Sequence, residues 1–410
     1  MIKRTIKQKL VNTINEYPVT LITGARQVGK SFLCNQIKEE YKWNYVSLDD
    51  KYEYDQAKND PRFFLEQHGW PLIIDEIQKV PELFEYIAPI VNNARLKDGN
   101  ISGMYLLTGS QQYTLMKNLR ESLAGRIGIL NLSTLSYSEI TGREEIPFEI
   151  NPNIMAMRTD KNFSKEKLYE MIIRGSYPKN FTSTNPKIFQ FYSNYVQTYL
   201  SRDVNEIINI RNLKTFQNFI KLLALHTGQE LVYESIAKDL SVDRKTLVSW
   251  VGILEVLDII YLLDPYFESS VEKSVLKRKK IYFKDTGLAC FLAGQHDSKT
   301  LSRTNPGAFV ETYVFNEILK SFENAEIAPP SLYYYRDRTG CEIDLVLLKN
   351  GELNLVEIKS GTTYSKKDVL AFEKMNKSKY QIGRGAVICT AEKLYAISQK
   401  VHAIPISAIN

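Results

Sequence analysis

A glycine-rich loop between a predicted strand and a predicted helix constrains this chain more than any other feature. The run VTLIT is apolar and β-branched, TGARQVGKS contains the loop, and FLCNQIKEEY has a helical pattern. The loop satisfies GxxxxGK[ST] with Gly24, Gly29, Lys30 and Ser31. In such a loop the backbone N–H groups surround phosphates, and the following helix directs the positive end of its dipole toward them. The strand before and the helix after favour a phosphate-binding loop over a chance match in a turn.

The loop predicts a nucleotide site that also holds Mg²⁺. Lys30 would neutralise the β- and γ-phosphate oxygens, and Ser31 would bind the magnesium ion. The residues expected to contact the nucleotide are Gly24, Ala25, Arg26, Gln27, Val28, Gly29, Lys30 and Ser31.

A second apolar run, PLIIDEIQ, contains two acids at its end, Asp75 and Glu76. Buried strands of a parallel sheet are continuous apolar runs, and functional residues gather at their carboxyl ends. We expect Asp75 to hold the magnesium ion through water, and Glu76 to orient and deprotonate an attacking water. A nucleotide kinase does not need the second carboxylate, so the pair favours hydrolysis.

Three more segments are predicted to complete the same parallel sheet: residues 43–50, residues 104–110 and the apolar run after Arg126. Thr108 or Ser110, at the end of the second, would contact the γ-phosphate or the attacking water. Small polar residues are common at strand ends, so a purely structural role is equally compatible. Arg126 would reach a phosphate as an arginine finger. Pairing with a surface carboxylate is its alternative.

Composition limits the remaining interpretations. A length of 410 residues exceeds one ordinary domain, and 44% hydrophobic with 24% charged residues is typical of globular proteins. A net charge of +6 permits a polyanionic partner without requiring one. The four cysteines are far apart, which favours a reducing compartment over a disulfide framework or a zinc site. No stretch approaches the ~20 apolar residues that span a bilayer, so we expect a cytoplasmic protein without a membrane partner.

The middle of the chain has helical patterns, including a predicted helix-turn-helix. The aromatic residues between 163 and 227 are expected in the core rather than as a base-stacking surface. Apolar spacing predicts two short helices around a turn at residues 241–243. Arg244 and Lys245 then lie at the start of the second helix, where such motifs meet DNA.

Two predicted wing strands, residues 259–263 and 280–285, follow the second helix. The loop between them is basic and suited to backbone phosphates. Its cationic residues are Lys273, Lys277, Arg278, Lys279 and Lys280. Winged helices also bind proteins, so contact with DNA and contact with a protein both remain open.

The segment CEIDLVLLKNGELNLVEIKSG is predicted to be a β-hairpin with two opposed acids. Its Asn-Gly dipeptide indicates a two-residue type I′ turn, which places Lys349 opposite Glu352 and Asp344 opposite Glu357. Opposed side chains have Cβ atoms ~4.5–5.5 Å apart, and like charges there destabilise a sheet. A divalent cation between the two acids would remove the repulsion. This favours a metal site over a solvent-exposed edge.

The order of Asp344, Glu357 and Lys359 resembles the core of the PD-(D/E)XK nuclease superfamily. The resemblance implies that Asp344 and Glu357 bind Mg²⁺, with Glu311 as the acid of the preceding helix, and that Lys359 positions or activates a water. Ile343 precedes Asp344 where the superfamily's name has proline, a position that varies in the superfamily. A fold that kept its acids but lost cleavage is the alternative. Two further expected phosphate contacts before the hairpin are Arg336 and Arg338.

Together TGARQVGKS, LIIDEIQ, LLTGS and SLAGRI resemble the AAA-type ATPases of bacteria and archaea that carry an uncharacterised C-terminal domain. RGSYP, YLSRDV, KDTGL and EIDLV…EIKS resemble later blocks of that family, so the resemblance covers nearly the whole chain. It implies ATP binding at Gly24, Gly29, Lys30 and Ser31. It also implies an α/β protein with an AAA-type P-loop parallel-sheet ATPase domain at 1–140. A helical and winged-helix domain at 141–295 and a mixed α/β restriction-endonuclease-like domain at 296–410 would follow.

Two hypotheses of function follow from these features. In the first, the chain is an ATPase that acts on DNA or another nucleic acid and has a Mg²⁺-dependent nuclease-like C-terminal domain. In the second, it is a nucleotide-driven signalling switch whose winged-helix and nuclease-like domains only bind a partner. A monomeric helicase is disfavoured, because no second motor core follows the first. Translocation would require a homo-oligomer formed through the ATPase domain.

Overall fold

The computed structural model of the protein describes residues 2–99, 101–110, 123–184, 186–200, 204, 213–267, 278–304, 306–337, 339–375 and 378–409. The chain divides into two compact units. The first unit comprises Met1–Leu135, Val256–Asp258 and Glu323–Glu326, and the second comprises Ser136–Glu255, Ile259–Phe322 and Ile327–Asn410. The expected middle and C-terminal domains therefore lie together in the second unit, and the boundary between them stays a prediction.

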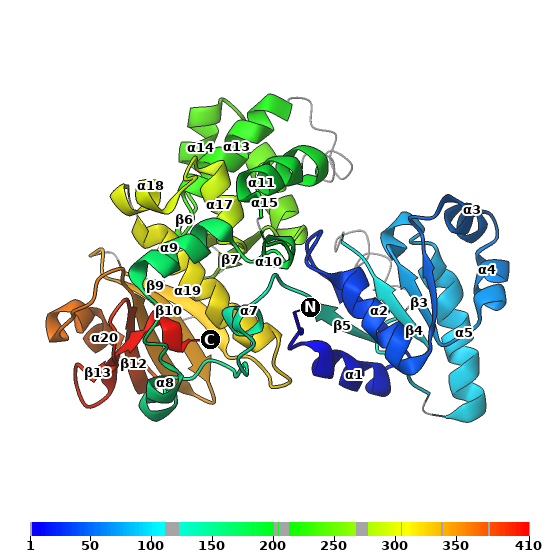
Figure 1. Ribbon diagram of the computed structural model, residues 1–410, viewed down its shortest axis with the longest axis horizontal. Helices are drawn as coiled ribbons and strands as arrows, with labels where there is room; N and C mark the ends of the chain where they lie inside the picture. Colours follow the sequence, from blue (N-terminus) through cyan, green and yellow to red (C-terminus); the bar gives the residue numbers. More distant parts are fainter. Residues whose placement is uncertain are drawn as a thin grey trace. The chain divides into compact units, whose positions relative to one another are not determined.

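A five-stranded parallel sheet forms the centre of the first unit (Figure 1). Its strands are β1 (Val19–Thr23), β2 (Asn44–Ser47), β3 (Leu72–Asp75), β4 (Tyr105–Thr108) and β5 (Ile127–Asn131), in the order β2-β3-β4-β1-β5. Every residue of β1, β3 and β4 is buried, which explains their unbroken apolar sequences. The carboxyl ends of β1, β3 and β4 lie at one edge, since Ile22 pairs with Thr108 and Ile74 with Leu107.

Helices connect these strands, and local capping explains where several of them begin. The helices are α1 (Lys7–Glu16), α2 (Lys30–Tyr41), α3 (Lys51–Asn59), α4 (Pro61–His68), the 3₁₀ turn η1 (Ile77–Lys79) and α5 (Leu83–Asp98). The Asp50 carboxylate accepts the backbone N–H of Tyr52 before α3. Asp60 caps α4 in the same way, and Pro61 occupies the first helical position.

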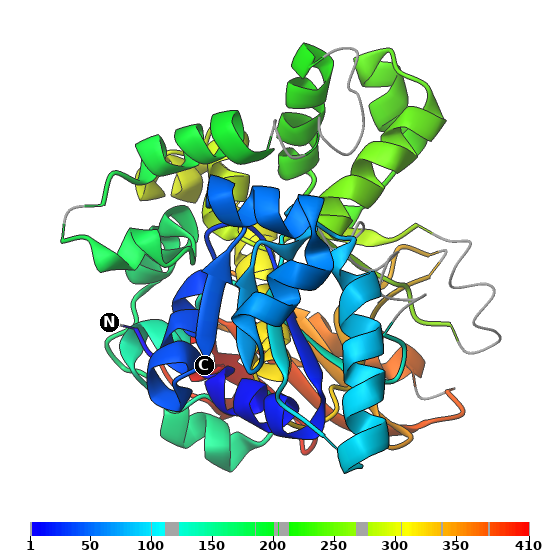
Figure 2. The ribbon, with the colours of Figure 1, turned by 90° about the vertical axis from the view of Figure 1, so that its right-hand side faces the viewer.

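The second unit begins with a helical region (Figure 2). Its helices are α7 (Tyr137–Thr141), α8 (Pro152–Arg158), α9 (Lys165–Arg174), α10 (Lys179–Thr182), α11 (Ile188–Tyr195), the π-helical turn η2 (Val196–Leu200), α13 (Leu213–Leu225), α14 (Tyr233–Leu240), α15 (Arg244–Val256), α17 (Thr286–Leu292) and α18 (Ser298–Arg303). The aromatic side chains of Phe191, Tyr192 and Tyr195 are buried, as expected for a core role.

Two helices and two strands lie where the sequence predicts a helix-turn-helix and its wing strands. Helices α14 and α15 are joined by a short turn in which Ser241 has a φ of 52°. Strands β7 (Ile260–Leu263) and β8 (Lys280–Phe283) pair antiparallel, and β6 (Gln229–Glu230) pairs with the other edge of β8.

The segments RGSYP and KDTGL contact each other beside the Tyr192 side chain. The buried Asp285 carboxylate accepts hydrogen bonds from the Tyr192 hydroxyl at 2.7 Å and from the backbone N–H groups of Ser176 at 2.7 Å and Leu288 at 2.8 Å. A Cβ at Gly175 would lie 2.0 Å from the Tyr192 oxygen, so the close approach requires glycine. These two segments therefore have a packing role.

A six-stranded mixed sheet forms the C-terminal part of the second unit. The elements are α19 (Pro306–Glu323), β9 (Ser331–Arg336), β10 (Glu342–Lys349), β11 (Glu352–Ile358), η3 (Lys366–Val369), α20 (Leu370–Lys374), β12 (Gln381–Cys389), β13 (Tyr395–Ala396), β14 (Val401–Pro405) and η5 (Ile406–Ala408). The predicted register of the β10–β11 hairpin is confirmed, because Lys349 pairs with Glu352 and Leu345 with Val356. Both turn residues have positive φ, as a type I′ turn requires.

Within the part of the chain that the structure describes, none of the helices has both the length and the apolar character needed to cross a membrane.

Candidate functional site

The loop between β1 and α2 has a backbone that requires glycine at its first motif position. Gly24 has a φ of 136°, and a Cβ there would lie 2.3 Å from the carbonyl oxygen of Leu132. Gly29 has a φ of 104° and directly precedes the first helical residue, Lys30. The Lys30 ammonium donates to the carbonyl oxygens of Gly24 and Ala25, both at 2.9 Å. The loop thus curls over the positive end of α2, the arrangement of a phosphate cradle.

The remaining loop residues differ in exposure. Ser31, the second residue of α2, and Gln27 are exposed, Arg26 is half-buried and Val28 is buried. Burial lowers the pKa of the Lys30 ammonium to about 8, although Glu76 and Asp75 act in the opposite direction. A lysine that is costly to keep charged without a phosphate is well placed to receive one.

Asp75 and Thr108 come together at the carboxyl ends of β3 and β4. The Thr108 hydroxyl donates to the Asp75 carboxylate, whose other oxygen accepts the Tyr45 hydroxyl at 2.9 Å. Asp75 is buried, and β4 lies between its strand and β1, which leads into the phosphate loop. The predicted magnesium residue therefore lies at the same sheet edge as the loop.

Glu76 follows β3 in a left-handed conformation with a φ of 61°. Its backbone N–H donates to the Thr108 hydroxyl at 3.2 Å, and its carboxylate accepts the side-chain amide of Gln78. Gln78 also donates to the Ser110 hydroxyl at 3.4 Å. The structure thus brings together Glu76, Thr108 and Ser110, and adds Gln78, which the sequence did not single out.

Arg126 lies at the opposite edge of the sheet from the phosphate loop. Its backbone carbonyl accepts the N–H of Val19, the first residue of β1, whereas the loop follows the last residue of that strand. The length of β1 separates the two by about 13 Å at a rise of roughly 3.3 Å per residue. The prediction that Arg126 reaches a phosphate is therefore wrong for its own chain, because a residue that precedes a parallel strand lies at the amino edge.

The sequence did not single out Arg4, whose side chain contacts the backbone of the phosphate loop. Its buried guanidinium donates to the carbonyl oxygens of Val28 and Ser133, both at 2.7 Å. These charge-assisted bonds tie the loop to the segment that follows β5. No local pattern marks this role, because the two partners are 24 and 129 residues away in sequence.

At the C-terminal hairpin, Asp344 and Glu357 lie directly beyond the last pair of the ladder, Leu345 with Val356, and their buried side chains interact. Glu357 pairs with the Lys359 ammonium at 2.8 Å, and Asp344 lies 3.9 Å from the same nitrogen. Burial, and then the neighbouring Asp344 charge, raises the pKa of Glu357 to about 9. The Lys359 ammonium, which lies beside both carboxylates, offsets part of the repulsion between them.

The Lys280 ammonium lies among carboxylates, so the prediction that it contacts phosphates from a basic loop is wrong. The sequence placed it in a basic loop for phosphates, but its side chain is 2% exposed. Its ammonium lies 2.6 Å from Glu311, 2.8 Å from Glu342 and 3.3 Å from Asp344. Burial and the Asp344 charge raise the pKa of Glu311 to about 7.

These C-terminal residues do not fit a divalent ion while Lys280 is in place. Mg²⁺ requires oxygen ligands at about 2.1 Å, and the oxygens that face the centre already accept the ammonium. Across the described residues, no three His, Cys, Asp or Glu side chains are grouped so as to hold a metal ion. The metal roles given to Glu311, Asp344 and Glu357 thus gain no support from the geometry.

Three family models match the chain. Residues 16–141 match an AAA domain, residues 165–299 match a domain of unknown function (DUF8612), and residues 306–409 match another domain of unknown function (DUF4143). The first match includes the phosphate loop, Asp75 and all five parallel strands. The first unit has an AAA-type P-loop core.

Known proteins are similar to the chain beyond this AAA domain. The uncharacterized protein Rv2008c of Mycobacterium tuberculosis (strain ATCC 25618 / H37Rv) is 26% identical over 411 residues, which cover 99% of this chain and 84% of that protein. The Walker-type ATPase PABY2304 of Pyrococcus abyssi has a TM-score of 0.42 and 16% identity over 71% of this chain and 96% of its own. A structure of a RuvB variant of Thermotoga maritima has a TM-score of 0.32 and 17% identity over 63% of this chain and 89% of its own.

Outside the AAA domain, the predicted nucleic-acid residues have mixed surroundings. Arg244 and Lys245 are exposed at the start of α15, although Arg244 also pairs with Glu234 at 3.1 Å. Arg278 is exposed, and Lys279 pairs with Asp264 at 3.1 Å. Arg336 lies 3.5 Å from Glu230 and 3.8 Å from Glu342. The other predicted contacts, Lys273, Lys277 and Arg338, lie outside the described residues.

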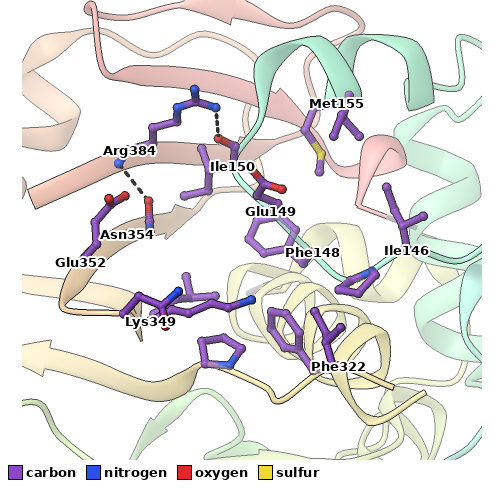
Figure 3. Close-up of a pocket in the computed structure, with 16 residues that line it drawn as sticks. Ile146, Phe148, Glu149, Ile150, Met155, Phe322, Lys349, Glu352, Asn354 and Arg384 are labelled. Carbon is purple, nitrogen blue, oxygen red and sulfur yellow. Dashed lines mark hydrogen bonds between the residues drawn. The ribbon is translucent and has the colours of Figure 1, made fainter. Parts of the chain in front are cut away.

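A cavity of about 750 Å³ opens beside the turn of the β10–β11 hairpin (Figure 3). Residues 146–150, Met155, Phe322 and Arg384 are among its lining. The Arg384 guanidinium donates to the carbonyl oxygen of Ile150 at 3.0 Å, which fixes the extended segment along the cavity (Figure 3). Its lining, among the described residues, includes none of those predicted for the nucleotide site or the carboxylate centre.

Proposed function

We propose that the AAA domain of this protein binds and hydrolyses ATP. The observation that supports it is the meeting of a complete phosphate loop with Asp75, Glu76 and Thr108 at the carboxyl edge of one parallel sheet. Phosphoryl transfer depends on positioning and on charge stabilisation, and these are the groups that provide both.

Each residue has a distinct role in this proposal. Backbone N–H groups of the loop bind the phosphates, and Lys30 leaves its carbonyl partners to neutralise the β- and γ-phosphate oxygens. The Ser31 hydroxyl and the Asp75 carboxylate are hard oxygen donors and fit Mg²⁺, which would stabilise the charge that develops on the phosphates. Glu76 orients the attacking water and accepts its proton, with Gln78 holding the carboxylate beforehand.

Replacement of Glu76 tests the hydrolytic role. Glu76→Gln is expected to lower kcat by roughly 10²-fold or more, because the amide no longer accepts a proton, while ATP binding is retained. Glu85→Gln, on an exposed position of α5, is the matched control and should keep the wild-type rate. Steady-state ATPase assays with a parallel measurement of nucleotide affinity decide the outcome. An unchanged rate in Glu76→Gln contradicts the proposal.

A second proposal is that ATP hydrolysis responds to DNA or another nucleic acid through the helix-turn-helix. The exposed Arg244 and Lys245 at the start of α15 support it, since this is the position from which such motifs meet DNA. Phosphodiester cleavage gains no such support, because two of the carboxylates it would use, Glu311 and Asp344, are paired with Lys280.

A titration of the ATPase rate with double-stranded DNA distinguishes the two functions that the sequence suggests, action on nucleic acid and a nucleotide-driven switch. Marked stimulation, lost in Arg244→Gln/Lys245→Gln, supports action on nucleic acid. A rate indifferent to DNA supports the nucleotide-driven switch, in which the second unit only binds a partner. A homo-oligomer, with Arg126 at the ATP site of a second copy, stays a prediction.

A further inference from the structure

The carboxylate centre of the second unit contains its own cation. A lysine ammonium has three N–H donors, and here three carboxylates lie around it, one from α19 and two from β10. These acids are Glu311, Glu342 and Asp344. The match of three donors to three acceptors leaves this ammonium fully paired.

The backbone holds Lys280 in this position. Lys280 is the first residue of β8, and β8 pairs on one edge with β7 and on the other with β6. Its side chain is 2% exposed, and a charge so deeply buried is tolerated only where it is paired. The lysine is therefore a built-in part of the centre rather than the end of a surface loop.

The oxygens around the centre have further partners besides Lys280. The second oxygen of Asp344 accepts the backbone N–H of Ile358 at 2.8 Å, and the Glu311 oxygen that meets Lys280 also accepts the Tyr282 hydroxyl at 2.6 Å. A divalent ion bound to the same oxygens would lie next to the Lys280 ammonium. Two adjacent positive charges repel strongly in a buried site.

We infer that Lys280 is the resident cation of this centre: the wild-type centre takes up no Mg²⁺ or Mn²⁺, and removal of the ammonium converts Glu311, Glu342 and Asp344 into a divalent-cation site. The three side chains then supply the carboxylate oxygens that these ions prefer. The inference goes beyond ATP hydrolysis and does not depend on it, because it concerns the second unit without nucleotide.

Lys280→Met removes the charge and keeps an unbranched side chain of similar length. In nucleotide-free protein, this variant is expected to bind one more Mn²⁺ per chain than the wild type, as measured by calorimetry and by the loss of the free Mn²⁺ electron paramagnetic resonance signal. Lys279→Met is the matched control, because it removes the same charge one residue away from the centre. Its Mn²⁺ stoichiometry should equal that of the wild type.

Thermal melting provides a second readout. Lys280→Met is expected to melt below the wild type, because it leaves buried carboxylates uncompensated, and Mn²⁺ should restore part of the loss in this variant alone. Addition of Asp344→Asn to Lys280→Met should abolish both the extra Mn²⁺ and the restoration.

Two results would overturn the inference. One is a folded Lys280→Met protein that binds no additional Mn²⁺. The other is a nucleotide-free wild-type protein that binds a Mn²⁺ ion which Asp344→Asn removes, and this arm is decisive even if Lys280→Met does not fold.

Discussion

Two buried lysines, Lys30 and Lys280, show how differently the same side chain behaves in the two units. For Lys30, burial outweighs the attraction of Glu76 and Asp75 and lowers the pKa to about 8. For Lys280, burial acts in the same direction, but Tyr282 and the three adjoining carboxylates together raise the pKa well above its ordinary value. The Lys30 ammonium would thus be stabilised by a bound phosphate, whereas the Lys280 ammonium is already stabilised by neighbouring carboxylates.

ATP binding is expected to weaken as pH rises above about 8. Phosphate oxygens favour the charged lysine, so the pKa of Lys30 is higher in the complex than in the free protein. Below pH 8 the lysine is charged in both states, and its contribution to affinity is constant. Above pH 8 binding must take up a proton, so affinity falls by up to about tenfold per pH unit. Calorimetry with a non-hydrolysable ATP analogue, in two buffers of different ionisation heat, measures the affinity and the proton uptake.

Lys30→Arg is the control for this pH dependence, because a guanidinium stays charged throughout the range. Its affinity, even if lower, should not decline between pH 8 and 9.5. A wild-type affinity that stays constant to pH 9.5 would contradict the role of Lys30 at the phosphates.

Residue roles were predictable from the sequence where the chemistry is local. The phosphate loop fits within nine residues, so Lys30 and its neighbours were identified directly. Lys280 was misassigned because its acid partners Glu342 and Asp344 lie 62 and 64 residues away, and nothing near it in sequence announces them. The wrong prediction that Arg126 reaches a phosphate of its own chain was avoidable. A residue that directly precedes a parallel strand lies at the amino edge of the sheet, away from the phosphate loop.

Among the connections between elements, the contact of RGSYP with KDTGL depends most clearly on a glycine, Gly175, which has no Cβ to clash with its neighbours. Gly175, after α9, has φ 65° and ψ −166°, and Gly69, after α4, has φ 62° and ψ −167°. Among the described atoms, nothing lies within 4 Å of a Cβ built at Gly69, whereas a Cβ at Gly175 would lie 2.0 Å from the Tyr192 hydroxyl and 2.6 Å from Asp285. The two glycines therefore share a backbone conformation and differ in crowding.

Gly175→Ala is expected to destabilise the second unit by roughly 2 kcal/mol or more beyond the loss that Gly69→Ala causes in the first. Both alanines suffer the same backbone strain, but only the former separates the Tyr192 hydroxyl from the buried Asp285 carboxylate. Denaturant unfolding, followed by probes in the unit that carries each substitution, gives the two values. Equal losses would show that strain alone, and not the contact with Tyr192, requires glycine there.

The β10–β11 hairpin shows how far an element can be predicted on its own. The Asn-Gly turn was sufficient to predict the register as far as Leu345 opposite Val356. The next residue of each strand is an acid, and the side chains of Asp344 and Glu357 interact. The next step, from opposed acids to a metal ion, was not supported, because it treated the hairpin as isolated. A compensating charge comes from Lys280 of β8, in another sheet, and it is not visible in the hairpin sequence.

At the scale of the whole molecule, the net charge of +6 permits attraction to a polyanion but does not locate it. Non-specific electrostatic attraction and contact at a defined surface can be separated, because only phosphates that are neutralised by contact release bound counterions. The salt dependence of DNA binding therefore reports contacts, whereas affinity at one salt concentration does not.

Arg244→Gln/Lys245→Gln removes two positive charges at the start of α15 and takes the net charge from +6 to +4. Lys366→Gln/Lys367→Gln removes the same charge from exposed positions of η3 in the same unit. If α15 contacts the DNA backbone, the slope of log affinity against log salt should shrink by about two in the first variant and stay unchanged in the second. Fluorescence anisotropy with a labelled duplex between about 50 and 200 mM salt covers the range in which such slopes are measured. Equal changes in both variants would mean that net charge alone attracts DNA, and that the start of α15 is not the contact.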